Sequence, residues 1–120
     1  MSVLVTGGTG AVGVNIVRVL AQAGYDVLCL SRRAHDVDPA LDRFLAPVRH
    51  RVTLVSGDVG DAGALVAIAR DYRTTDVVHA AAITPSAEME RSSAPDILQV
   101  NFMGTVYVLE AARRCNVRRV

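Results

Sequence analysis

The sequence predicts an α/β fold, a doubly wound parallel sheet with helices on both faces and strand order 3-2-1-4-5. Two observations carry this prediction. Short apolar runs alternate with segments of helical periodicity along the chain, as in strand–helix–strand units. The first run also passes straight into a glycine-rich turn, Gly7–Gly13, and from there into the first helical segment. Right-handed crossovers then set the strand order. With 120 residues, 51% of them hydrophobic, and no repeat or linker, we expect one domain over residues 1–120.

The first two strands enclose a helix. Ser2–Thr6 has the composition of a buried strand, and Ala11–Ala23 has helical periodicity. The apolar positions of this helix recur at spacings of three and four, at Val12, Ile16, Val19, Leu20 and Ala23. Gly24 ends the helix as a C-terminal cap. Val27–Leu30 is the second strand.

The middle of the chain supplies the third strand and its helix. Arg32–Pro47 is polar, with a short helix expected near Ala40–Ala46. Arg51–Val55 is the third strand. Asp61 caps a helix that runs to about Tyr72, with its inward side chains at Leu65, Ile68 and Ala69.

The last third holds the fourth strand and a long helix. Asp76–Ala80 is the strand, Thr84–Ala94 is expected to be a loop, and Pro95 suits the first turn of a helix to about Arg114. Arg118–Val120 has the composition of a fifth strand that is cut short. Such a break would leave the fourth strand as an apolar edge, so we expect these residues to be part of a larger functional unit.

The glycines match two templates. Gly8, Gly10 and Gly13 satisfy G-x-G-x-x-G, and Gly7, Gly10 and Gly13 satisfy T-G-x-x-G-x-x-G. Both indicate a dinucleotide-binding, Rossmann-like turn. One glycine allows a conformation closed to other residues, one lets the backbone approach a pyrophosphate, and Gly13 lets the helix pack on the strand.

The helix after this turn completes a phosphate site. Its first residues, Ala11 and Val12, have free N–H groups and lie at the positive end of the helix dipole. The alternatives are a tight turn without a ligand and a P-loop. A P-loop needs a lysine after its last glycine, but Val14 stands there, and all 13 basic residues of the chain are arginines.

The end of the second strand predicts NADP rather than NAD. NAD-binding turns place a carboxylate there to accept from the ribose 2′-hydroxyl, whereas this chain has Ser31, Arg32 and Arg33. Guanidinium groups match phosphate oxygens. The nearest carboxylates lie at the wrong end of the strand or well beyond it, at Asp26, Asp36 and Asp38. Alternatively, the arginines are a solvated pair, and Ser31 would serve either cofactor.

Two more segments predict cofactor contacts. Asp58, with Val59 beside it, follows the third strand and can accept from an adenine amino group, or form an Asx-turn instead. Ala80, Ala81 and Ala82 leave the fourth strand with side chains small enough for a ligand to lie close.

Two polar residues near these segments have structural explanations as well. His79, a lone histidine at a strand end, is more often structural than catalytic. Asn101 lies three residues before Gly104 on one helix face, where it offers an amide inward, and the pair could equally be a packing notch.

Four segments of the chain together resemble the extended short-chain dehydrogenase/reductase family, also called the NAD-dependent epimerase/dehydratase family. They are "VTGGTGAVG", "GDVGD", "DVVHAAA" and "NFMGTVYVLEAARRCNVRRV". The resemblance covers essentially the entire chain. It implies that the glycine turn holds the pyrophosphate, that Asp58 contacts adenine and that the alanines flank the nicotinamide ribose. It also implies that Asn101 supports the catalytic network.

The chain lacks the catalytic elements that this resemblance implies. The family uses a serine or threonine after the fifth strand and a Tyr-x-x-x-Lys pair, whereas Tyr25, Tyr72 and Tyr107 are followed four residues on by Cys29, Asp76 and Ala111. We therefore expect no catalytic residue within residues 1–120. The hypothesis is the cofactor-binding portion of an NAD(P)-dependent oxidoreductase, epimerase or dehydratase, whose substrate binds to the full-length parent. The alternative is a non-catalytic NADP-binding or redox-sensing module.

The composition of the chain also bears on which classes of partner it binds. The net charge of +1 gives no electrostatic case for nucleic acid or an anionic membrane, and no apolar run approaches a membrane span. The histidines and cysteines show no metal-ligand spacing. Cys29 and Cys115 have no motif spacing, so we expect buried thiols and a cytoplasmic location. Family dimers usually pair through helices, so a homodimer is compatible with the resemblance.

Overall fold

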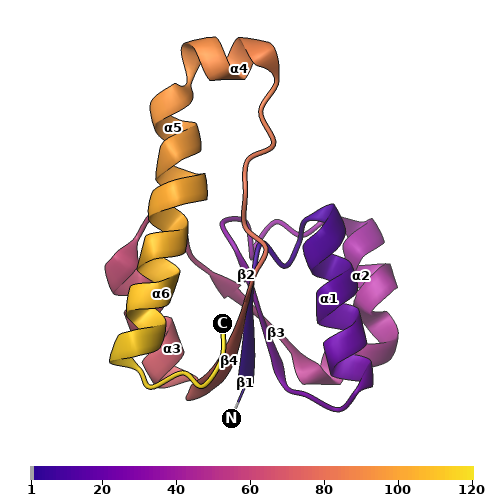
Figure 1. The fold of residues 1–120 in the computed structure, drawn as a ribbon. Coiled ribbons are helices and arrows are strands. Elements are labelled where there is room, and N and C mark those ends of the chain that lie inside the picture. The colour runs from indigo at the N-terminus through magenta and orange to yellow at the C-terminus, as the bar shows by residue number, and fades with distance from the viewer. Residues whose placement is uncertain (1) are drawn as a thin grey trace.

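Four parallel strands form one sheet at the centre of the molecule (Figure 1). The structure is a computed structural model, and it describes residues 2–120. The strands are β1 (Ser2–Thr6), β2 (Val27–Ser31), β3 (Val52–Ser56) and β4 (Thr74–His79), in the order β3-β2-β1-β4. This arrangement confirms the predicted fold class and the order 3-2-1-4. A fifth strand is represented by a single parallel bridge between Asp76 and Arg119.

Helices cover both faces of the sheet (Figure 1). On one face lie α1 (Ala11–Gln22), α2 (Pro39–Leu45) and the 3₁₀ turn η1 (Ala46–Arg51); on the other lie α3 (Ala62–Asp71) and α6 (Gly104–Arg114). The remaining elements, α4 (Ala87–Ser92), α5 (Ala94–Leu98) and the π-helical turn η2 (Gln99–Met103), form an arm that continues α6 beyond the sheet.

The strands divide the core by alternation. Val3 and Val5 of β1 pack towards α1, whereas Leu4 packs towards α3 and α6. Because successive side chains of a strand point to opposite faces, the middle of a strand covered on both sides is apolar on both faces. All five residues of β1 and of β2 are buried, which explains the apolar runs Val3–Val5 and Val27–Leu30; the buried polar residues lie at the strand ends and are hydrogen-bonded, at Ser2, Thr6 and Ser31.

The apolar periodicity of α1 does not identify its buried face. The helix buries Gly13, Val17 and Ala21, whereas two of the apolar positions singled out by spacing, Val12 and Val19, are 69% and 62% exposed. Apolar residues occur all round this helix, so their spacing alone cannot choose a side. The choice depends on Gly13, since only the face that carries this glycine can approach β1 closely.

The carboxyl end of α1 has the cap that the sequence predicts. Gly24 has a φ of +93°, its N–H donates to Ala21, and the next N–H, of Tyr25, donates to Leu20. This pair of bonds is a Schellman motif, in which a residue of left-handed conformation ends the helix. Gly24 therefore confirms the predicted C-terminal cap.

The segment Thr84–Ala94, expected to be a loop, contains helix α4. Ser86 caps it by accepting from the Met89 N–H at 3.2 Å, and Glu88 lies in the first turn. A serine cap followed by acidic residues is a helix start signal, so this prediction was wrong although the sequence held the evidence. Ser93 occupies the N-cap position of α5 without a side-chain hydrogen bond.

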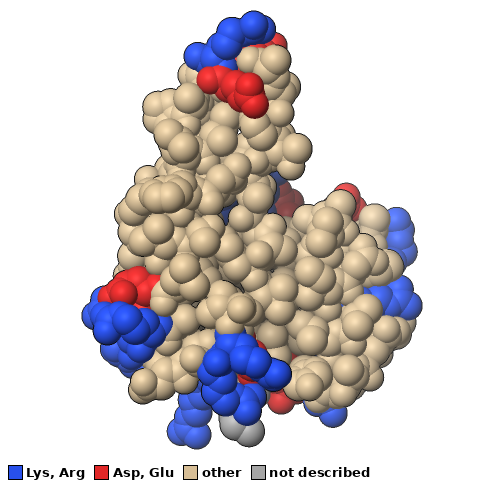
Figure 2. All heavy atoms as spheres, viewed as in Figure 1, with Lys and Arg blue, Asp and Glu red and all other residues tan. Residues whose placement is uncertain are grey.

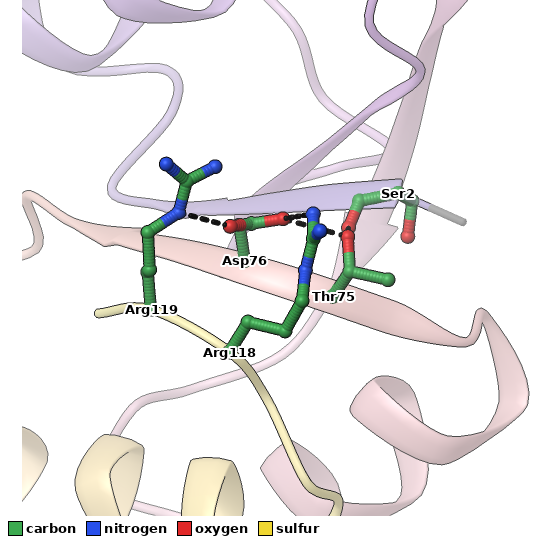
Figure 3. A network of polar contacts seen from close by, with 5 residues as sticks. All are labelled: Ser2, Thr75, Asp76, Arg118 and Arg119. Atoms are coloured by element: carbon green, nitrogen blue, oxygen red, sulfur yellow. Dashed lines mark hydrogen bonds and ion pairs between the residues drawn. The ribbon is translucent and has the colours of Figure 1, made fainter.

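An ion-pair cluster at the amino end of the sheet holds the last residues in place (Figure 3). Asp76 accepts from Arg118 at 2.8 Å, from Arg119 at 2.7 Å and from the Thr75 hydroxyl at 2.7 Å. These donors hold the pKa of the Asp76 carboxyl far below its usual value. Backbone bonds from Arg118 N–H to Thr75 and from Val77 N–H to Arg119 continue the β4 edge. The segment therefore lies where a fifth strand belongs.

One buried hydroxyl carries a prediction about stability. Thr74 is 4% exposed, and among residues 2–120 its Oγ1 is the buried side-chain polar atom without a hydrogen-bond partner. Desolvating an unpaired polar group opposes folding by about 1–3 kcal/mol. Thr74→Val keeps the β-branched shape and should raise the free energy of unfolding in urea by about 1 kcal/mol. Thr6→Val, which removes a fully bonded hydroxyl, should lower it; a loss of stability in Thr74→Val would contradict the assignment.

Candidate functional site

In the glycine turn Gly7–Gly13, backbone segments pack too closely at two positions to leave room for side chains. Gly7 has a φ of +64°, and a Cβ on it would lie 2.8 Å from the N and Cα of Ala81. A Cβ on Gly13 would lie 2.0 Å from the carbonyl oxygen of Gly7. Neither position tolerates a side chain. Because Gly7 adopts the left-handed conformation that glycine favours, the T-G-x-x-G-x-x-G template describes the turn better than G-x-G-x-x-G.

Gly8 serves packing instead. A Cβ on Gly8 would lie 2.5 Å from the Sγ of Cys29, so the turn lies directly on this buried thiol. Burial raises the pKa of Cys29 to about 11, which keeps the thiol neutral near neutral pH. Cys29 is therefore a small core residue beneath the turn.

The first turn of α1 presents free backbone donors. Gly10 is the N-cap and supplies no side-chain bond, and the first turn holds no acidic residue. Within the described part of the chain, the N–H groups of Ala11, Val12 and Gly13 have no acceptor, while Val14 N–H already donates to Gly10. Unpaired N–H groups at the positive end of a helix dipole attract an anion.

A cleft of about 640 Å³ opens at the carboxyl ends of the strands. Figure 2 shows the hollow between the arm and the α1–α2 side, with acidic and basic atoms visible in its depth. This volume lies in the range of small-molecule and cofactor sites. Its position at the carboxyl edge is where open α/β sheets bind ligands.

Most of the residues predicted to contact a cofactor line this cleft: Gly7, Gly10, Ser31, Arg32, Asp58, Val59, Ala80, Ala81 and Ala82. The other four do not form its wall. Ala11 and Val12 begin α1, Gly13 packs beneath Gly7, and Asn101 lies behind the loop that follows β4.

The cleft also includes residues that the sequence did not single out or placed elsewhere. Asp36 and Asp38 line it, although their distance from the end of β2 predicted otherwise. The loop Arg32–Asp38 folds back over the cleft, with Asp36 N–H donating to the Arg33 carbonyl. Asp38 caps α2 by accepting from Ala40 N–H at 2.7 Å. Sequence distance alone does not show such a return of the chain.

Asp58 forms the Asx-turn that was one of the two roles weighed for it. Its Oδ1 accepts from Gly60 N–H at 2.8 Å, which is an Asx-turn. The side chain is exposed in the cleft wall, and its second oxygen has no partner among residues 2–120. Beside it, Val59 is buried against Gly104, where a Cβ would lie 2.9 Å from Val59 Cγ2. Gly104 is therefore the close-packing notch proposed as one interpretation of the helix.

A polar relay begins beneath the cleft floor. Thr6 Oγ1 accepts from the N–H groups of Ala80 and Ala81 at 3.1 and 3.2 Å. Both of its acceptor positions are then used, so its proton goes to Nδ1 of His79, 2.7 Å away. His79 is thereby assigned the neutral tautomer with its proton on Nε2. Burial lowers the pKa of His79, in agreement with this assignment.

The relay continues into the long helix and returns to the cleft. His79 Nε2 donates to Thr105 Oγ1 at 3.1 Å, and Thr105 donates to the Asn101 carbonyl at 3.0 Å. The Asn101 amide then holds both backbone groups of Ile83, accepting from its N–H at 2.7 Å and donating to its carbonyl at 2.8 Å. The expected inward amide of Asn101 thus positions the loop Ala80–Ile83.

No pattern in the sequence shows that these residues form one relay. Thr6 and His79 are 73 residues apart, and no spacing rule connects a strand-end threonine to a histidine on another strand. The parallel register, which pairs Thr6 with His79, is the signal that finds it. His79 has a structural role here, as expected.

The neutral state of His79 predicts a pH effect on stability. Its pKa in the folded protein lies below the unfolded value of 6.5, so the unfolded chain takes up a proton first as pH falls. The stabilisation is therefore fully present above pH 6.5 and is lost as pH falls towards the lowered folded pKa. Urea unfolding at pH 7.5 and 5.5 should show a larger loss in the native protein than in His79→Gln. An equal loss in both proteins would assign the pH dependence to other groups.

Comparison with known proteins identifies the family. The model of the "NAD dependent epimerase/dehydratase family" matches residues 3–120. The chain belongs to this family. It is 37% identical to dTDP-glucose 4,6-dehydratase of Mycolicibacterium smegmatis, with 98% of this chain and 34% of that protein covered.

Solved structures agree with the family assignment. UDP-glucose 4-epimerase of Thermus thermophilus, in complex with NAD, is 31% identical with a TM-score of 0.78, and 98% of this chain and 35% of that one are covered. UDP-glucose-4-epimerase from Stenotrophomonas maltophila, with bound NAD and formylated UDP-arabinopyranose, shares the fold with a TM-score of 0.83 at 24% identity over 98% and 34%. The chain thus spans about a third of the length of these family members.

Proposed function

We propose that this chain is the dinucleotide-binding portion of an NAD(P)-dependent enzyme of the epimerase/dehydratase family. The observation that carries the proposal is the turn Gly7–Gly13. Gly7 and Gly10 line the cleft as bare backbone, and the N–H groups of Ala11, Val12 and Gly13 follow them at the start of α1 without an acceptor among residues 2–120. A pyrophosphate fits this donor set, because it offers several negatively charged acceptor oxygens and needs close backbone approach.

Three other regions support the fit of a whole dinucleotide. Asp58 would accept from the adenine amino group, and Val59 would contact the ring. Ser31 and Arg32 would hold the adenosine ribose at the end of β2. Ala80, Ala81 and Ala82 would flank the nicotinamide ribose, with Asn101 holding their loop through Ile83. When bound, the nicotinamide would supply hydride transfer.

Gly10→Ala tests the pyrophosphate site directly. Gly10 has a φ of −75°, which alanine adopts readily, and the added Cβ would meet one atom, the Gly7 carbonyl oxygen at 3.3 Å, in a tight contact that a shift of a few tenths of an ångström relieves. The variant is therefore expected to fold, with its methyl group taking space at the cleft wall. Titration with NADPH and NADH should show affinity for both reduced by at least about tenfold. Gly63→Ala in α3, where the new Cβ meets only ordinary contacts, is the matched control and should bind like the native protein. Native-like binding by folded Gly10→Ala would contradict the proposed site.

We further propose that the cofactor is NADP in preference to NAD. Arg32 and Arg33 line the cleft at the end of β2, where a 2′-phosphate would lie. Asp36 lines the same wall and supports the alternative, because a carboxylate there would accept from the 2′-hydroxyl of NAD.

Arg32→Ala tests this preference. We expect the native protein to bind NADPH more tightly than NADH, and Arg32→Ala to lose about tenfold in NADPH affinity with little change for NADH. Arg43→Ala, exposed on α2 outside the cleft lining, should keep the native preference. Equal affinities in the native protein would remove the case for Arg32 and favour Asp36 with NAD.

Under this proposal, the full-length parent protein binds the substrate and catalyses the reaction. The rival proposal, a non-catalytic NADP-binding or redox-sensing module, predicts the same cofactor binding without turnover. The coding sequence after Val120 separates them: a downstream Tyr-x-x-x-Lys pair supports the enzyme.

We also propose a cytoplasmic location and a homodimer of the parent. The first rests on two free thiols, Cys29 and Cys115, which suit a reducing compartment. Within residues 2–120 no helix is long and apolar enough to cross a bilayer, and no three His, Cys, Asp or Glu side chains are grouped to hold a metal ion. The homodimer rests on the family resemblance and is tested by the mass of the protein in solution.

A further inference from the structure

The Ser31 hydroxyl at the end of β2 has both of its acceptor positions occupied by the protein. Thr9 Oγ1 donates to Ser31 Oγ at 3.1 Å, and the Arg33 N–H donates to the same oxygen at 3.1 Å. A hydroxyl accepts two hydrogen bonds and donates one. No group among residues 2–120 accepts from Ser31 Oγ. Only the donor function of Ser31 is therefore left for a ligand.

The backbone holds Ser31 firmly in this position. The residue is 9% exposed, pairs with Ser56 in the sheet, and accepts from Gly57 N–H at 3.1 Å through its carbonyl. Its side chain nevertheless lines the cleft, together with Thr9 and Arg32. Because the main chain is fixed on both sides, the direction of the hydroxyl proton depends on the two bonds that the oxygen accepts.

We infer that Thr9 orients the Ser31 hydroxyl as a donor towards the 2′ position of the adenosine ribose, and so raises selectivity for a 2′-phosphate over a 2′-hydroxyl. This inference rests on the proposed function, which places a dinucleotide in the cleft. Thr9 acts through Ser31 and is a positioning residue. The sequence gives no sign of this role, since Thr9 occupies a variable position of the glycine template.

The chemistry of the two ligand groups explains the selectivity. A phosphate accepts hydrogen bonds and carries charge, so a hydroxyl that can only donate matches it, and charge-assisted bonds are about twice as strong as neutral ones. A ribose 2′-hydroxyl carries a proton that needs an acceptor. Ser31 cannot accept it while Thr9 and Arg33 N–H occupy its oxygen. Removing the Thr9 hydroxyl frees one acceptor position and lets the Ser31 proton turn away.

The test compares Thr9→Val with Thr9→Ser in the whole protein. Val keeps the branched shape and removes the donor, whereas Ser keeps the hydroxyl. We expect Thr9→Val to bind NADPH about fivefold more weakly and NADH within about twofold of native, and Thr9→Ser to keep the native ratio. Because both coenzymes share the pyrophosphate, NADH affinity reports whether the glycine turn is intact.

A double-mutant cycle tests whether Thr9 acts through Ser31. Ser31→Ala should weaken NADPH binding at least as much as Thr9→Val, and the double variant should lose no more than Ser31→Ala alone. Additive losses, an unchanged NADPH/NADH ratio in Thr9→Val, or equal losses for both coenzymes would each overturn the inference. If folded native protein binds neither coenzyme saturably, the proposed function itself fails, and the two failures are thereby distinguished.

Discussion

The site depends on the approach of backbone segments at the first crossover. Gly7 lies against the backbone of Ala81, and Gly13 lies against the carbonyl of Gly7. A single methyl group at either position would meet atoms that cannot move without displacing a strand end or a helix. These contacts set the distance between the ends of β1 and β4, the rotation of α1 and the position of its first N–H groups. The cleft is a consequence of them.

The polar relay follows from the same constraint. With β1 and β4 this close, the N–H groups of Ala80 and Ala81 are partly buried against Thr6 and need acceptors, because unpaired buried donors oppose folding. The hydroxyl of Thr6, the residue before the glycine turn, accepts from both N–H groups. Its remaining proton requires an acceptor, and His79 provides it in the neutral state. The bonding of the whole cleft floor is thereby coupled to the protonation of one histidine.

The sequence predicted the strands and the glycine turn, because these depend on residues that are close together in the chain. The apolar runs predicted the buried strands, and the glycine spacing predicted the turn. The spacing fits two templates, and only the φ of Gly7 in the structure distinguishes between them. The buried face of α1 does not follow from the sequence, because Val12 and Val19 share the spacing of core residues, while packing on Gly13 decides the rotation. Helix α4 was missed although Ser86 and Glu88 signal its start. Thr9–Ser31 and Thr6–His79 join distant segments, and only the sheet register brings them together.

Two parts of the cleft lining differ in chemistry, the glycine turn with the alanines after β4, and the segment after β2. Under the proposed function they would have different roles in binding. The backbone donors of the glycine turn and the methyl groups of Ala80, Ala81 and Ala82 would hold the part that NAD and NADP share. The segment at and after the end of β2 adds charged and hydroxyl side chains to the lining, among them Ser31, Arg32 and Asp36. Backbone donors cannot be altered by substitution without disturbing the fold, whereas these side chains can. Affinity for the shared part of a dinucleotide would therefore be tied to the fold, whereas selectivity at the ribose would be free to vary on the same framework.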